Sequence, residues 1–180
     1  MTLEDIQKAI LALIEELNPD SDFLTDDPDI QAKINHVINQ IQYELARLKK
    51  IPALETETVE ENEDYDMNDL PNFYQLRLVR DVNCDIIDNI ITFKEAGTAK
   101  IYYYKYPTAI TEETDKTRYK FELSSDALHI LPYGVAADLL KSDVASNYGQ
   151  IYAQRYQELK SQLDPRYNLG AIQFDGGVSL

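Results

Sequence analysis

Tryptophan is absent from this chain of 180 residues, which has one cysteine and two histidines. The single cysteine, Cys84, excludes an internal disulfide framework and is typical of a protein assembled in a reducing cytoplasm. No apolar run approaches the ~20 residues of a membrane-spanning helix, and the N-terminal residues lack the basic start of a signal peptide. We therefore expect a soluble cytoplasmic protein without membrane contact.

Groups that could carry out chemistry are also scarce. His36 and His129 stand alone beside isoleucines, where a histidine usually packs, and no second His or Cys lies at a metal-ligand spacing. The aspartates of residues 20–27 lack the glycine and the closing glutamate of a calcium loop. Cys84 follows Asn83 and precedes Asp85, whose charge disfavours a thiolate. We predict no catalytic, cofactor-binding or metal-binding residue, and hence no enzyme.

Positive charge is in short supply, with 17 Lys and Arg against 32 Asp and Glu and a formal net charge of −15. That balance argues against affinity for nucleic acid over most of the surface. The acidic residues gather in two zones: residues 1–27 hold eight against Lys8 alone, and residues 55–70 hold eight with no basic residue. Either the zones only keep the protein in solution or they serve its function.

What the sequence does contain is enough apolar residues, 44%, for a globular core. A helix is predicted from Thr2, with Asp5 completing a capping box, to a stop at Asn18-Pro19. A second helix is predicted from Asp27-Pro28, an N-cap followed by proline at the first helical position, to about Lys50. Each carries one apolar stripe, which indicates an antiparallel pair whose core needs further helices.

The pattern then changes. Residues 53–70 are acidic and poor in apolar residues, which predicts a loop, whereas residues 71–123 contain runs of period two. We predict strands over 74–78, 86–93 and 99–106, joined in an antiparallel meander. Residues 117–123 would add either a fourth strand or a strap.

Two more helices are predicted over residues 126–142 and from Ser142-Asp143 to about Leu163, with an irregularity near Pro132. The predicted fold is therefore mainly α with a β insert (α+β): a four-helix bundle with a three- to four-stranded antiparallel meander between its second and third helices. Residues 1–166 would form one domain, with helices over 1–52 and 126–164. The residues expected to pack the bundle are Leu131, Val135, Ala136, Leu139, Tyr148, Tyr152 and Tyr156.

The last segment, residues 167–180, contains Gly170, Gly176 and Gly177 around a short uncharged run. Such a tail is either frayed or docked on another protein. Ala171, Ile172, Gln173 and Phe174 would suit addition as an edge strand to a partner's sheet.

The run Leu-Pro-Tyr-Gly-Val-Ala-Ala-x-Leu-Leu at 131–140, followed by a helix with spaced tyrosines, resembles the head–tail connector (neck adaptor) proteins of long-tailed bacteriophages. The order of elements and the strand Tyr102–Pro107 are similar to that family over nearly the whole chain. The resemblance implies a structural protein of a phage or prophage, assembled in the bacterial host cytoplasm and located in the virion neck. It implies a ring of identical copies, a dodecamer, between the portal protein and a stopper or tail-completion protein. DNA would pass through this ring without specific binding, and the residue 171–174 segment would dock on the portal.

A second hypothesis is an acidic interaction module, such as a DNA-mimicking inhibitor that occupies a nucleic-acid-binding cleft. It accounts for the charge but not for the β insert or the glycine-flanked tail.

Overall fold

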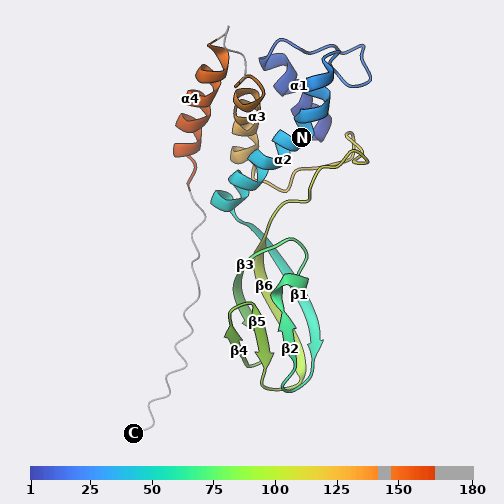
Figure 1. Ribbon diagram of the computed structural model, residues 1–180. Coiled ribbons are helices and arrows are strands. Elements are labelled where there is room, and N and C mark those ends of the chain that lie inside the picture. Colours follow the sequence, from blue (N-terminus) through green and yellow to red (C-terminus); the bar gives the residue numbers. More distant parts are fainter. Residues whose placement is uncertain (142–146, 165–180) are drawn as a thin grey trace. The chain divides into compact units, whose positions relative to one another are not determined.

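The computed structural model describes residues 1–141 and 147–164 and shows an α+β protein with four helices and two small three-stranded antiparallel sheets (Figure 1). Contacts divide it into two compact units. The helical unit comprises residues 1–51 and 105–164, and the β unit comprises residues 52–104. The domain predicted over residues 1–166 thus groups together two units, each of which has its own apolar core.

The first two helices begin where the capping signals predicted. In α1 (Leu3–Leu13), the Thr2 side chain accepts a hydrogen bond from the Asp5 N–H at 3.2 Å, and the Asp5 carboxylate accepts one from the Thr2 N–H at 2.8 Å. In α2 (Pro28–Lys49), the Asp27 carboxylate caps the first turn. The helix α1 ends earlier than predicted, and Glu15 just beyond it has a positive φ of 62°.

The other two helices are α3 (Ser125–Leu139) and α4 (Tyr148–Ser161), and α3 continues through Pro132 without interruption. The predicted four-helix bundle is wrong. Instead, α1, α2 and α4 each pack on α3, and the irregular segment that precedes α3 contributes Ile110, Phe121 and Leu123 to the core. A short α1 of 11 residues offers too little apolar surface to close the core with helices alone, so this segment completes it.

That segment, residues 106–124, is called the strap below. It supplies backbone acceptors to the start of α1: the Tyr119 carbonyl accepts from the Leu3 N–H at 3.2 Å, and the Lys116 carbonyl accepts from the Glu4 N–H at 3.1 Å. The predicted fourth strand over 117–123 is reduced to one isolated bridge between Thr2 and Lys120. Of the two alternatives for these residues, the structure shows the strap.

The acidic stretch 53–70 is not the predicted loop. It forms β1 (Ile51–Val59), β2 (Asp64–Asp66) and the short 3-10 helix η1 (Met67–Asp69). Along β1, half-buried Glu55 and Glu57 alternate with exposed Thr56 and Thr58. Because β1 is an edge strand, its carboxylates can reach water, and charge at an edge also discourages unwanted strand pairing. Net charge is therefore a poor reason to exclude a strand.

The remaining strands are β3 (Phe73–Arg80), β4 (Cys84–Ile87), β5 (Ile90–Phe93) and β6 (Gly97–Lys105). The strand predicted over 86–93 is in fact two strands, because the chain turns at Asp88, which has a φ of 53°, and Asn89. The strand orders are β1-β6-β3 and β2-β5-β4, so the predicted single meander is wrong. The core of the unit draws side chains from both sheets, including Ile101 of β6 and Phe93 of β5.

Candidate functional site

The residues predicted to pack the bundle differ in burial. Leu131, Val135 and Ala136 are completely buried and Tyr156 nearly so, whereas Leu139 and Tyr152 are partly buried. Tyr148 departs from the prediction, because 55% of its surface is exposed. The first four therefore belong to the core, and Tyr148 is available at the surface.

Gly134 lies in the run 131–140 that resembles connector proteins, and it allows α2 and α4 to pack closely on α3. A Cβ atom added there would lie 2.9 Å from Cε2 of Tyr156 on α4 and 3.1 Å from Cγ2 of Ile41 on α2. The absence of a side chain at Gly134 therefore lets Tyr156 and Ile41 pack directly against α3. Burial at this contact raises the pKa of the Tyr156 hydroxyl.

The predicted docking residues Ala171, Ile172, Gln173 and Phe174 lie outside the described residues, as does the predicted start of the fourth helix at Ser142-Asp143.

Titratable residues singled out from the sequence do not converge. His36 and His129 are exposed on α2 and α3, and burial together with Asp85 raises the pKa of the Cys84 thiol. Within residues 1–141 and 147–164, no group of three or more His, Cys, Asp or Glu side chains is placed to hold a metal ion. Among the helices of the same residues, none is both long and apolar enough to cross a membrane.

The tyrosines of β6 serve packing. Tyr103 is 3% exposed, donates a hydrogen bond to the Pro71 carbonyl at 3.2 Å and lies against the Phe73 ring. Tyr102 lies under the guanidinium of Arg80, 5.8 Å from the ring centroid. Successive strand residues point to opposite faces, so these rings do not form one stacking platform.

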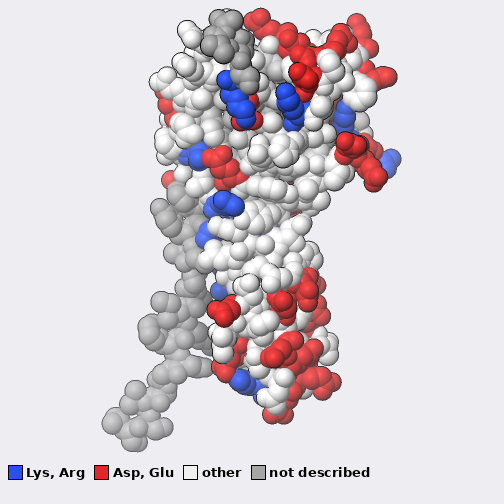
Figure 2. Space-filling view, viewed as in Figure 1, with Lys and Arg blue, Asp and Glu red and all other residues white. Residues whose placement is uncertain are grey.

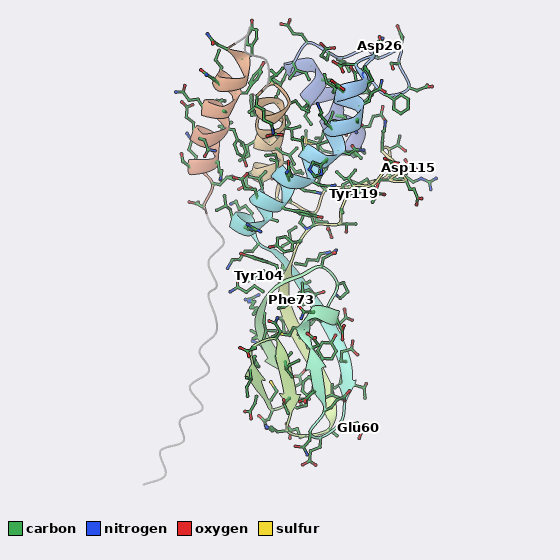
Figure 3. The ribbon with its side chains drawn as sticks, in the orientation of Figure 1. Asp26, Glu60, Phe73, Tyr104, Asp115 and Tyr119 are labelled. Carbon is green, nitrogen blue, oxygen red and sulfur yellow. The ribbon has the colours of Figure 1, made fainter. Side chains whose placement is uncertain are left out.

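The β unit carries a concentrated acidic surface (Figure 2). Residues 52–104 contain twelve Asp and Glu and four Lys and Arg, a net charge of −8. Two of the four bases are paired within the unit, Lys94 with Asp85 at 2.8 Å and Lys100 with Asp81 at 2.7 Å. In the part of the chain that the structure describes, no ion pair involves the acidic residues of β1, the turn after it, β2 and η1, where Figure 3 marks Glu60. We call these residues the acidic surface: Glu55, Glu57, Glu60, Glu61, Glu63, Asp64, Asp66 and Asp69.

Both units expose large apolar side chains. In the β unit, Ile87 and Ile86 of β4 are 71% and 48% exposed, on a strand at the edge of its sheet. The helical unit exposes Phe23, Tyr148 and Ile151 by more than half. The two isoleucines were not predicted as a surface patch, although adjacent isoleucines break the alternation of a half-buried strand and so give a signal in the sequence.

A pocket of about 570 Å³ opens in the helical unit, where the end of α1, the start of α2, the end of α3 and the start of α4 meet. Its apolar wall includes Ile14 and Leu140, and the hydroxyl of Tyr152 donates a hydrogen bond to the Leu13 carbonyl at 2.6 Å. The pocket was missed from the sequence because four separate segments line it. Its lining residues are Leu13, Ile14, Glu15, Glu16, Asp27, Asp29, Ile30, Lys33, Leu139, Leu140, Tyr148 and Tyr152.

Compared with models of known protein families and with curated proteins, the chain matches none.

Proposed function

We propose that this chain is a head–tail connector: a structural protein that forms a ring between the portal and the tail-proximal neck proteins of a phage or prophage. The observation that carries the proposal is the presence of exposed large apolar side chains in both units, on Ile86 and Ile87 of β4 and on Tyr148 and Ile151 of α4. A ring requires two different patches on each subunit, since each copy contacts its neighbours through unlike surfaces. In a single copy, the apolar side chains of such a patch are exposed, because no neighbouring copy covers them.

The acidic surface supports the same proposal for a different reason. A channel that conducts DNA has to avoid holding the duplex, and carboxylates repel phosphates. In the connector, the acidic surface of β1, β2 and η1 would line or flank the DNA path.

The partners follow from the resemblance of residues 131–140 and of the order of elements to connector proteins. The portal protein would lie on one side of the ring and a stopper or tail-completion protein on the other, with twelve copies in the ring. Residues 167–180 would carry the portal contact, with Ile172 and Phe174 as the side chains that fill pockets.

Electron microscopy of the purified full-length protein, mixed with rings of the portal protein from the same genome, tests the proposal. We expect an added ring of density on the portal. Deletion of residues 167–180 should abolish that density without changing the melting temperature. Portals that stay bare with the intact protein would refute the connector assignment. Bare portals combined with tight binding to a DNA-processing enzyme would instead support the DNA-mimic reading, which the acidic surface also favours.

A matched pair of variants tests the ring contact. Ile87→Asp adds a carboxylate to the exposed edge of β4, and Thr56→Asp adds one to exposed β1 of the same unit. We expect Ile87→Asp to prevent ring closure on the portal, because it places a charge in a contact that buries apolar surface. Thr56→Asp should leave the ring intact. If Ile87→Asp forms the ring on the portal as well as Thr56→Asp does, β4 takes no part in the contact.

A further inference from the structure

We infer that the pocket of the helical unit is a docking site for a basic peptide segment that carries a large apolar side chain. The inference rests only on the walls and the rim of the pocket and concerns the free protein, because Tyr148 also belongs to the apolar side chains proposed above as a ring contact. A volume of about 570 Å³ falls within the range of ligand sites and exceeds what one side chain fills.

One wall of the pocket carries apolar and aromatic side chains, and its two tyrosine rings stack on each other. The ring centroids of Tyr148 and Tyr152 lie 6.5 Å apart and the rings are nearly parallel, at 25°. Behind the pocket lining, the Tyr133 ring supports Tyr152 at a centroid distance of 6.4 Å. Tyr152 is fixed by its hydrogen bond to the Leu13 carbonyl. Tyr148 lies at the outer end of the stack and remains 55% exposed, so its ring offers a free face.

The rim is acidic. Glu15, Glu16, Asp27 and Asp29 line the pocket with Lys33 as the one base among the lining residues, which gives a local net charge of −3. Across the described parts of the chain, Glu15, Glu16 and Asp29 form no ion pair. These three carboxylates are exposed and available to a ligand.

Wall and rim together select the chemistry of the occupant. An apolar side chain of the partner would enter between Leu140, Ile30 and Tyr152, and Lys or Arg beside it would meet the carboxylates. Arginine gains a second contact, because its guanidinium can stack on the free face of Tyr148. An acidic segment would be repelled and a purely polar one would leave the apolar wall in water.

The test uses the full-length protein to select binders from a library of random short peptides. We expect the enriched sequences to combine Arg or Lys with a Leu or an aromatic residue. Affinity of a selected peptide, followed by fluorescence anisotropy, should fall as salt is raised. Failure to enrich that class, or enrichment of polar basic peptides of equal affinity, would overturn the inference.

Two matched comparisons locate the binding. Glu16→Lys/Asp29→Lys and Glu60→Lys/Glu61→Lys change the net charge equally, but only the first pair lies at the pocket. We expect the first to weaken peptide binding about tenfold or more and the second to change it less than about twofold.

Tyr148→Ser should also weaken binding, whereas Phe23→Ser, which removes a similarly exposed ring outside the pocket, should not. Equal losses from the matched variants would mean unspecific attraction to an acidic protein. Self-association that only the pocket variants abolish would make a second copy the occupant, and would overturn the proposed partner.

Discussion

At the scale of single residues, Gly134 decides how closely α4 approaches α3. Gly134→Ala would gain about 1 kcal/mol of helix propensity. Its Cβ, however, would lie 2.9 Å from the buried ring of Tyr156 and 3.1 Å from Ile41, and overpacking of this kind costs about 1–3 kcal/mol. Because an aromatic ring buried between helices moves less readily than a flexible chain end, we expect a net loss of about 1 kcal/mol in the free energy of unfolding, measured by urea denaturation.

A double-mutant cycle separates this clash from other effects. Tyr156→Leu removes the ring that Gly134 accommodates, so adding Gly134→Ala to that variant should cost less than it costs the wild type. Additive losses would show that the ring does not set the spacing.

Asp126 gives a prediction about pH. The hydrogen bond from the Lys49 ammonium at 2.6 Å is the main cause that lowers the pKa of the Asp126 carboxyl from 3.8 to about 2, and the Ala127 N–H contributes at 3.0 Å. A lowered pKa means that the carboxylate stabilises the fold above pH 3.8 and that this contribution disappears as pH falls through about 2. The contribution is small, because the Asp126 side chain is 47% exposed to screening solvent.

We therefore expect Asp126→Asn to lower the melting temperature slightly at neutral pH, with the difference from wild type vanishing between pH 3.8 and about 2. Thermal unfolding of both proteins across this range measures the difference. A difference that stays constant with pH would assign it to packing rather than to the charge.

At the scale of elements, the side-chain amide of Asn39 attaches the strap to α2. Asn39 of α2 donates to the Ile110 carbonyl at 2.8 Å and accepts from the Ile110 N–H at 2.9 Å. Buried Gln42 adds a bond to Asn39, and the Tyr119 hydroxyl donates to the Thr108 carbonyl at 2.6 Å (Figure 3 labels Tyr119). The network holds Ile110 and Phe121 over the helical core.

Asn39→Ala leaves the backbone polar groups of Ile110 without their partner, which we expect to cost about 1–3 kcal/mol. Amide hydrogen exchange should rise in the strap and at the start of α1, which bonds to it. Gln40→Ala, an exposed position on the same helix, is the control and should change neither stability nor exchange. Unchanged exchange in the Asn39 variant would show that apolar packing alone retains the strap.

Elements with a local chemical signature could be predicted from the sequence. Thr2 with Asp5, and Asp27 with Pro28, fixed two helix starts correctly because capping involves residues only a few positions apart. The strands of residues 51–66 were missed because their charge suggested a loop, although the threonines of β1 favour an extended chain. Residues 117–123 alternate like a strand, but whether a strand forms depends on a free edge elsewhere, which local patterns do not reveal. The pocket is missed for the same reason, since its walls come from four segments.

At the scale of the whole molecule, negative charge is more concentrated in the β unit than elsewhere. Its 53 residues have a net charge of −8, whereas the other 127 residues of the chain have −7, and the acidic surface supplies eight of the carboxylates of the unit. Exposed apolar side chains lie in both units. Apolar patches favour association, whereas like charge on every copy opposes it. Which effect dominates depends on ionic strength, because salt screens repulsion and leaves apolar burial largely unchanged.

This balance leads to a prediction for the free protein. At a net charge of −15 per copy, repulsion should outweigh the patches, so the protein should sediment as a monomer at low salt and associate weakly at moderate salt. A ring would then close only on a portal, which holds the copies together and offsets the repulsion. Analytical ultracentrifugation at two salt concentrations measures the association state.

Glu60→Lys/Glu61→Lys should shift association to lower salt, because it removes negative charge from the acidic surface. A stable closed ring at low salt would refute the need for a template, while the connector assignment would still be decided by imaging with the portal.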